Sequence, residues 1–234
     1  MGHRDDLLQW YATLPANTTF VRPADLVNLV RSRPLPPQAR IIDVGCGQGQ
    51  AAIALAQAVP DADIWGFDLS PQQIDHAQHN AQHAQVRNVR FVASDWRDFS
   101  LPNNAIDVIV CTQVIQFVDD EHALVEYMMQ GLAQNGQLLI RTAFLPDDEP
   151  QRAFVERIFK QWLQYSVRFY SERDLTELMR DVGLRHFRID KEEMWLDALP
   201  PERERVLQHE LRQHGYSRDD VQPWFWAGTI SAVK

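Results

Sequence analysis

The sequence predicts an α/β protein whose doubly wound, mostly parallel sheet carries helices on both faces. Short apolar runs alternate with helix-like stretches, which is typical of a parallel sheet. The apolar run 41–44 leads through a turn with glycine at every second position into the helix formers of 51–56. A second apolar run, 64–67, ends at Asp68. Together these features predict a nucleotide-cofactor site at the carboxyl edge of the sheet.

The expected elements follow the chain in order. Two helical segments within 5–32 precede the first strand, and Ser70, Pro71 and Gln73 open a later helix as cap, first-turn proline and capping-box glutamine. Further elements are expected as strands at 89–94, 105–111 and the end of 131–140, a loop at 144–150, helices at 151–165, 171–182 and 201–214, and strands at 184–189 and 225–233. The chain is expected to form one domain over 1–234, with a helical cap at 1–37, a cofactor-binding core at 38–143, a substrate-side insertion and helix at 144–183, and C-terminal strands with an inserted helix at 184–234.

The turn favours a cofactor other than a dinucleotide. Glycine permits positive φ values and leaves room for a ligand, which meets the free N–H groups of the helix start. A dinucleotide fingerprint requires glycine at position 50, where the chain has Gln50. Asp43, two residues before Gly45, would repel a pyrophosphate but could organise the loop or attract an ammonium group. NAD is therefore disfavoured.

The run 43–49, Asp-Val-Gly-Cys-Gly-Gln-Gly, resembles the first motif of the class I S-adenosylmethionine-dependent methyltransferases. Later strands and helices occur in the order of this family, so the resemblance covers 38–143 well and 169–189 loosely. It implies a Rossmann-like sheet of seven strands, closed by an antiparallel pair at the C-terminus. It also implies that the glycine turn lies against the methionine part of S-adenosyl-L-methionine.

The expected cofactor residues come from strand ends. The Asp68 carboxylate would accept hydrogen bonds from both ribose hydroxyls, as an acid at this place does in many nucleotide folds. By resemblance, Asp95 takes the adenine amino group, with Trp96 beside it. The full expected set is Asp43, Gly45, Cys46, Gly47, Gly49, Asp68, Leu69, Asp95, Trp96, Cys111 and Thr112.

Composition excludes several classes of function. The net charge is −9, and the 23 basic residues form no cluster that would neutralise a phosphate backbone, so a nucleic-acid partner is not expected. The alternative is a local basic stripe, for which Arg152, Arg157, Lys160 and Arg168 are the candidates. No apolar run approaches the roughly 20 residues that span a bilayer, and the charged start is no signal peptide. A cytoplasmic monomer or homodimer that does not bind membranes is expected.

Histidines and cysteines do not predict a metal site. His76, His79 and His83 share one helical face, but Ile74 and the alanines of the opposite stripe must face the sheet, so the histidines point to solvent. Cys46 and Cys111 are too far apart for a local metal cluster and are expected to be packed residues.

A small acceptor is expected outside the carboxyl ends of the strands, under the N-terminus and the stretch after the fifth strand. Aromatic residues are concentrated in these outer segments and near the C-terminus, which suggests an aromatic-lined pocket, although each one alone is better explained as a core residue. They are Trp10, Tyr11, Phe20, Trp162, Tyr165, Phe169, Tyr170, Trp195, Trp224, Phe225 and Trp226. Polar candidates for orienting the acceptor are Gln113, Gln116, Arg141, Tyr11 and Tyr170. Each could equally be structural, and Arg141 could instead pair with an acid of the following loop.

The expected function is methyl transfer from S-adenosylmethionine to an O, N or C atom of a small, partly aromatic or apolar metabolite. Such a displacement needs mainly alignment and exclusion of water. Many members of the resembled family carry a histidine where this chain has Gln116, which cannot take a proton, and His122 is expected to be exposed. The alternatives are other S-adenosylmethionine chemistry on the same fold, such as cyclisation or another group transfer, an NAD-dependent oxidoreductase, and a non-catalytic cofactor-binding module.

Overall fold

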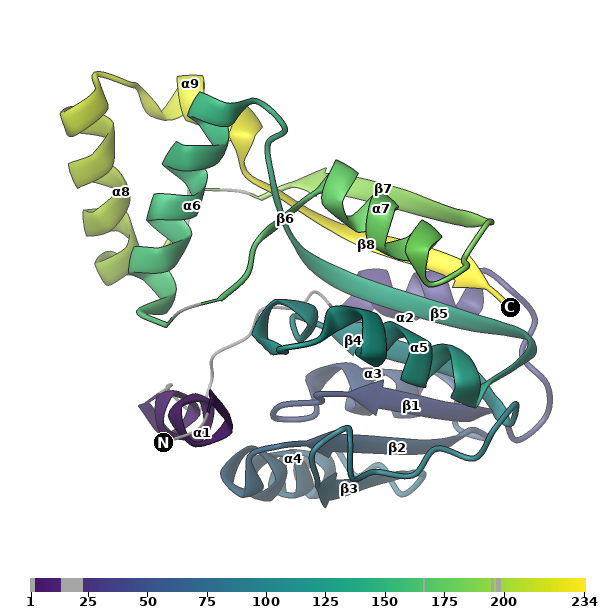
Figure 1. Cartoon of the computed structure of the whole chain (residues 1–234). Coiled ribbons are helices and arrows are strands. Elements are labelled where there is room, and N and C mark those ends of the chain that lie inside the picture. The colour runs from purple at the N-terminus through teal and green to yellow at the C-terminus, as the bar shows by residue number, and fades with distance from the viewer. Residues whose placement is uncertain (1–2, 14–22, 166, 195, 197–198) are drawn as a thin grey trace.

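A single mixed sheet forms the centre of the computed structural model, which describes residues 3–13, 23–165, 167–194, 196 and 199–234 (Figure 1). Its strands are β1 Arg40–Val44, β2 Asp63–Asp68, β3 Val89–Ala93, β4 Ile106–Thr112, β5 Leu132–Leu145, β6 Tyr170–Ser171, β7 Phe187–Glu193 and β8 Trp226–Val233. They lie in the order β3-β2-β1-β4-β5-β8-β7, and the short β6 pairs with β5. The strands β1 to β5 are parallel, whereas β8 runs antiparallel to both β5 and β7. The predicted doubly wound sheet with its antiparallel C-terminal pair is confirmed, and β6 is an addition.

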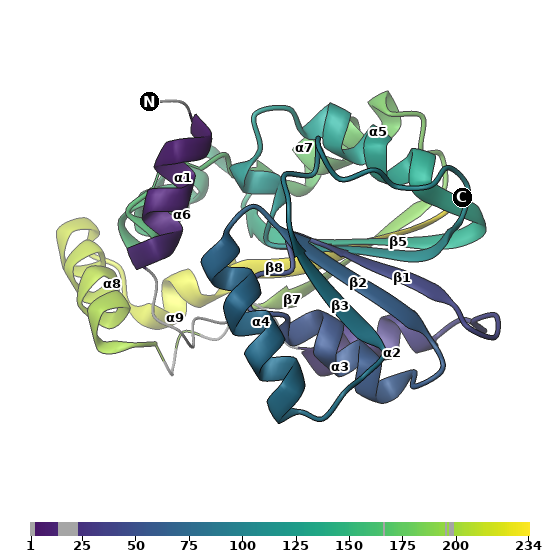
Figure 2. The same cartoon turned by 90° about the horizontal axis from the view of Figure 1, so that it is seen from below.

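Helices cover both faces of the sheet (Figure 2). The helices α2 Pro23–Arg31, α3 Gln50–Ala58 and α4 Pro71–His83 lie on one face, and α5 Glu121–Gly131 and α7 Glu172–Asp181 lie on the other. Successive side chains of a strand point to opposite faces, so in β1 Ile41 packs in the apolar cluster of α2 and α3, and Ile42 in that of α5 and α7. In α4, Ile74 and Ala77 are buried while His79 is exposed, as the helical pattern predicts.

A second group of helices lies beyond the ends of the strands (Figure 1). It consists of α6 Glu149–Leu163, α8 Pro201–His214 and the short α9 Arg218–Val221. These helices have their own apolar core, which includes Phe154, Ile158, Phe159, Leu207, Leu211 and Phe225. The bounds of α8 are those predicted. The expected loop 144–150 is shorter than predicted, because β5 continues to Leu145 and the Asp148 side chain caps α6 by accepting the Gln151 N–H.

The two N-terminal helices take different places. Helix α1, His3–Thr13, lies near the carboxyl ends of the strands, and its Trp10 donates from Nε1 to the Leu163 carbonyl over 2.6 Å. Helix α2 instead buries Leu26 and Val30 against the sheet. Of the described residues of the expected N-terminal cap, therefore, only those of α1 lie over the site edge. No helix in the described part of the chain is long and apolar enough to cross a membrane.

Candidate cofactor and acceptor site

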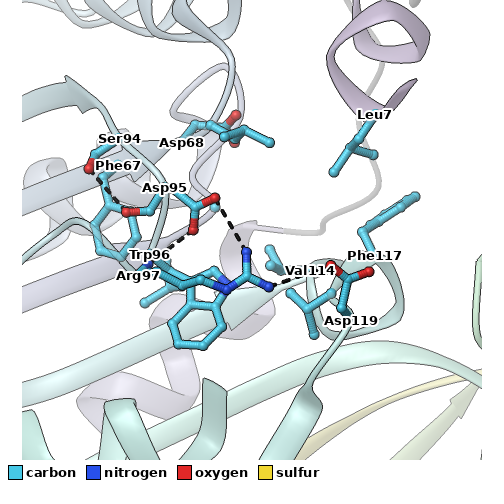
Figure 3. Close-up of a pocket in the computed structure, with 14 residues that line it drawn as sticks. Leu7, Phe67, Asp68, Ser94, Asp95, Trp96, Arg97, Val114, Phe117 and Asp119 are labelled. Carbon is cyan, nitrogen blue, oxygen red and sulfur yellow. Dashed lines mark hydrogen bonds and ion pairs between the residues drawn. The ribbon is translucent and has the colours of Figure 1, made fainter. Parts of the chain in front are cut away.

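A pocket opens at the carboxyl ends of β1, β2 and β4, where the sequence places the glycine turn (Figure 3). Its apolar wall contains Leu7 of α1, Val44 of β1, Leu69, Val114, Phe117 and Val118. Acids from separate strand ends, Asp68 and Asp95, line the same pocket. This is the crevice in which doubly wound sheets bind their ligands.

The glycine turn is tightly packed on one side and open on the other. Gly45, Gly47 and Gly49 have φ values of +67°, +51° and +81°, which only glycine adopts without strain. A Cβ at Gly45 would overlap Cγ2 of Val114 and stand 3.2 Å from its Cγ1, and one at Gly49 would stand 2.7 Å from the Phe91 ring. A Cβ at Gly47 would meet no heavy atom within 4 Å. The turn can therefore approach a ligand closely with its backbone.

Asp68 is held by the turn that follows β1 and by the start of α4. Its Oδ2 accepts the Gly47 N–H and its Oδ1 accepts the Ser70 N–H, both over 2.9 Å. Burial raises the pKa of the carboxyl, and these two N–H donors oppose the rise. A carboxylate fixed in this way keeps further lone pairs for ligand hydroxyls at the pocket wall.

Asp95 lies at the end of β3 in a network around Arg97 (Figure 3). Its Oδ1 accepts the Arg97 backbone N–H over 3.0 Å. The Arg97 guanidinium lies 3.5 Å from Oδ2 of Asp95, 3.6 Å from Oδ2 of Asp119 and 4.9 Å from the Trp96 ring centre. Arg97 thus links the segment after β3 to the segment after β4 along one side of the pocket.

Five of the expected cofactor residues line this pocket, and the other six are not among its lining residues. Gly45, Asp68, Leu69, Asp95 and Trp96 line the pocket. Asp43, Cys46, Gly47, Gly49, Cys111 and Thr112 are not among its lining residues. Burial raises the pKa of both thiols. Cys46 and Cys111 are therefore buried, packed residues.

Asp43 is fully buried beneath the turn. Neither of its carboxylate oxygens has a hydrogen-bond partner of normal geometry among the described residues. Burial raises its pKa to about 7, the Ala52 backbone N–H opposes the rise, and the charge of Asp68 adds to it.

Four of the five polar residues expected to orient an acceptor fall into two groups on opposite faces of the sheet. Gln116 is buried, its Nε2 donates to Oε1 of Gln113 over 2.8 Å, and its Oε1 accepts from the Thr142 hydroxyl over 3.0 Å. The buried Tyr170 hydroxyl donates to the Ile115 carbonyl over 3.4 Å, and burial raises its pKa. These residues form a polar cluster on the α5 side of the sheet.

Arg141 forms the other group. It donates to the Thr229 hydroxyl over 3.1 Å and pairs with Glu192 of β7, not with an acid of the loop after β5. Tyr11 belongs to α1, but its side chain lies outside the described residues. His122 is half exposed and lies 3.7 Å from the Asp181 carboxylate.

The aromatic residues that line the pocket differ from the aromatic residues that the sequence suggested. Trp162, Phe169, Trp224 and Phe225 pack in or against the core of α6 and α8. Trp10 lies 5.3 Å from Phe117 and 5.2 Å from Tyr165, ring centre to ring centre, beside the pocket. Phe20 and Trp195 lie outside the described residues. Among described side chains, the aromatic lining residues are Phe67, Trp96 and Phe117.

Sequence reasoning did not single out Leu7, Phe67, Ser94, Arg97, Val114, Phe117, Val118 and Asp119 as site residues, although they line the pocket. Arg97 and Phe67 could have been found, because each is close in sequence to an expected acid at a strand end. Leu7 and Phe117 carry no such signal. Their place depends on how α1 and the segment after β4 pack.

Comparison with known proteins identifies the family. A family described as "Methyltransferase domain" matches residues 36–182, more than half of the chain, so the chain belongs to this family. The resemblance predicted from the glycine motif is confirmed.

Two curated relatives and one solved structure illustrate the range of similarity. Trans-aconitate 2-methyltransferase of Enterobacter sp. (strain 638) is 32% identical over 120 residues, which are 50% of this chain and 44% of the relative. The chain spans about half the length of this and other curated relatives that it matches. Carboxy-S-adenosyl-L-methionine synthase of Aeromonas hydrophila is 27% identical over 216 residues, 89% of this chain and 79% of the relative. Geranyl diphosphate C-methyltransferase of Streptomyces coelicolor, solved with Mg²⁺, geranyl diphosphate and S-adenosyl-L-homocysteine, covers 100% of this chain and 98% of its own at a TM-score of 0.73 and 13% identity. At that identity the likeness concerns the fold.

Proposed function

We propose that this chain is an S-adenosylmethionine-dependent methyltransferase that acts on a small-molecule acceptor. One observation carries the proposal. Asp68 lines the pocket beside the glycine turn, and each of its two carboxylate oxygens accepts a hydrogen bond from a backbone N–H group. This arrangement fits the ribose of a nucleoside cofactor. The family of the chain supports the same reading.

The residues of the pocket fit the cofactor. Asp68 would hold the two ribose hydroxyls, and Asp95 the adenine amino group. Leu69, Val114 and Val118 offer apolar contact for the adenine ring. The backbone at Gly47, where a Cβ would meet open space, leaves room for the chain that the cofactor carries beyond its ribose. When bound, the cofactor supplies a sulfonium methyl group that is transferred as the sulfur becomes a neutral thioether.

The residues of this chain are proposed to orient the acceptor and to exclude water from the pocket. Leu7 and Phe117 bring apolar surface to the mouth of the pocket, which favours exclusion of water. Gln113 and Gln116, fixed by their mutual hydrogen bond and by Thr142, are proposed to orient the acceptor, with Tyr170 and Arg141 as further candidates. Because an amide does not titrate in this range, catalysis is proposed to depend on alignment rather than on a general base.

We further infer that the acceptor is a small, partly aromatic or apolar metabolite methylated at O, N or C. The three aromatic lining residues favour such an acceptor. The net charge of −9 argues against nucleic acid. A cytoplasmic monomer or homodimer remains the proposed state.

A second candidate is other chemistry with the same cofactor. It is favoured by the relative from Aeromonas hydrophila, a carboxy-S-adenosyl-L-methionine synthase, whose alignment spans 89% of this chain. A third, a non-catalytic cofactor-binding module, would bind the cofactor without turnover.

Cofactor binding and product mass test the proposal. Calorimetry should give micromolar affinities for S-adenosylmethionine and S-adenosylhomocysteine and no binding of NAD. Metabolite extract is then incubated with the protein and S-adenosylmethionine carrying an isotope-labelled methyl group, with Asp68→Ala protein as control. A labelled product formed by the wild type alone supports methyl transfer. If a product forms without the labelled methyl group, the second candidate is favoured. The same holds if the cofactor itself is modified and no labelled acceptor is found.

A further inference from the structure

Asp43 is a buried acid with no partner to balance its charge. It lies at the carboxyl end of β1, directly before Val44 and Gly45, which line the pocket. Its side chain is 0% exposed, and neither oxygen has a hydrogen-bond partner of normal geometry among the described residues. An ionised carboxylate in such a place is costly unless a cation or donors compensate it.

The groups around Asp43 disfavour its charge. Among its titratable neighbours, the charge of Asp68 of β2 disfavours ionised Asp43. The thiols of Cys46 and Cys111 stay neutral near pH 7, because burial raises their pKa, and so offer no compensating charge. The nearest favourable dipole is the Ala52 N–H in the first turn of α3. Burial and Asp68 together raise the pKa of Asp43 to about 7, so about half of the molecules keep the proton at pH 7 and most of them keep it at pH 6.

We propose that Asp43 holds a proton in the cofactor-free protein and releases it to solvent when the cationic cofactor occupies the neighbouring pocket. This inference rests on the proposed function, because S-adenosylmethionine brings a sulfonium and an ammonium group. In proteins, a positive charge brought within about 4 to 6 Å of a carboxyl lowers its pKa by about one to three units, with about two units as the middle of that range. The proton on Asp43 then couples cofactor binding to pH from behind the glycine turn.

The proposal predicts a defined proton stoichiometry. With a pKa near 7 in the free protein and about two units lower in the complex, binding releases about 0.8 proton at pH 6 and about 0.1 at pH 8. The same shift strengthens binding by about tenfold between these pH values. S-adenosylhomocysteine is a suitable probe because it is stable and keeps the ammonium group; it has no sulfonium, so the single positive charge that it tests is the ammonium group.

The experiment is calorimetry with S-adenosylhomocysteine at pH 6 and pH 8, each in two buffers of different ionisation enthalpy. The wild type is compared with Asp43→Asn, which keeps the shape, and with Glu210→Gln as the matched control. Glu210 is also buried, but it lies in α8 next to Arg157, away from the pocket. Any titration of the ligand itself is common to all three proteins and cancels in the comparison.

We expect proton release from the wild type and Glu210→Gln proteins and none from Asp43→Asn. The ratio of wild-type to Asp43→Asn affinity should rise about tenfold from pH 6 to pH 8. Equal proton release in all three proteins, or an affinity ratio that does not change with pH, overturns the proposal. If S-adenosylhomocysteine fails to bind the wild type at both pH values, the proposed function itself is wrong and this inference falls with it.

A direct titration covers the case in which Asp43→Asn does not fold. In wild-type protein with ¹³C-labelled aspartate, the Asp43 side-chain carbon should titrate near pH 7 when free and at a lower pH with S-adenosylhomocysteine bound. A free-protein carboxylate that stays ionised from pH 5 to pH 8 overturns the proposal.

Discussion

A single methyl group added at Gly45 tests how the glycine turn is packed. At Gly45 an added Cβ meets both a positive φ of +67° and the Val114 side chain. At Gly47 it meets only a positive φ of +51°, with no atom within 4 Å. Gly183, after α7, has a φ of +84° and equally open surroundings, but it lies outside the glycine turn; neither Gly183 nor Gly47 is among the lining residues of the pocket. The three alanine variants therefore separate backbone strain, steric overlap and position.

The expected losses in the free energy of unfolding follow from these differences. Holding alanine in a left-handed conformation costs about 1 to 2 kcal/mol, which is the full expected loss in the free energy of unfolding for Gly47→Ala and Gly183→Ala. Gly45→Ala adds the cost of overpacking against Val114, about 1 to 3 kcal/mol. The total for Gly45→Ala is then about 2 to 5 kcal/mol.

Two measurements check this reasoning. Urea unfolding followed by circular dichroism gives the stabilities, and calorimetry gives the affinity for S-adenosylhomocysteine. Gly183→Ala should bind normally, whereas Gly45→Ala should bind weakly because Val114, which lines the pocket, has to move. Gly45→Val should abolish binding. Val114→Ala should restore part of the stability that Gly45→Ala loses.

The reasoning is refuted if the stabilities of Gly45→Ala and Gly47→Ala agree within about 0.5 kcal/mol, the usual error of additivity. It is equally refuted if Gly45→Val is folded and binds the cofactor normally. In either case Val114 would not be the residue that requires glycine at position 45.

Three further outcomes are expected. Asp68→Ala should weaken S-adenosylhomocysteine binding in calorimetry by about 1.5 to 3 kcal/mol, because a charged acceptor is lost, and unchanged affinity would contradict its assignment to the ribose. Once an acceptor is known, Gln116→Ala should lower kcat about tenfold and His122→Ala less. A step in kcat between about pH 6 and 8 that disappears in His122→Ala, with a loss above about a hundredfold, would identify His122 as a base instead. Finally, the pKa of Asp43 is near 7 in the folded protein and near 3.8 when unfolded, so between these values the native state binds the additional proton. Stability of the cofactor-free protein should therefore fall as the pH rises from 4 to 7, by at most about 4 kcal/mol, and Asp43→Asn should remove this fall in urea titrations.

Local sequence was sufficient for most elements and for part of the site, although β6 was missed and the strand expected at 184–189 lies at Phe187–Glu193. The helix 201–214 was predicted with the bounds of α8, and Ser70 and Pro71 begin α4 as their capping pattern requires. The same is true of Gly45 and Asp68, because a glycine turn after one strand and an acid at the end of the next are neighbours in any parallel sheet of this order.

Contacts between distant segments were decided by tertiary structure. Arg141 pairs with Glu192 because β5, β8 and β7 lie side by side, an arrangement that no local pattern reveals. Leu7 reaches the pocket because α1 packs against the segment around Phe117.

The chain by itself determined which side chains could contact a cofactor, and the packing of the sheet decided which of them line the pocket. Val44 lines the pocket, whereas the adjacent Asp43 is buried behind the wall. Successive residues of a strand point to opposite faces, and only the finished sheet fixes which face opens to a ligand. The periodicity of apolar residues is a property of the sequence. The burial of a side chain, the charges around it and its hydrogen-bond partners are properties of the folded molecule. For Asp43 this difference turns an acid of an expected binding motif into an unpaired buried carboxyl.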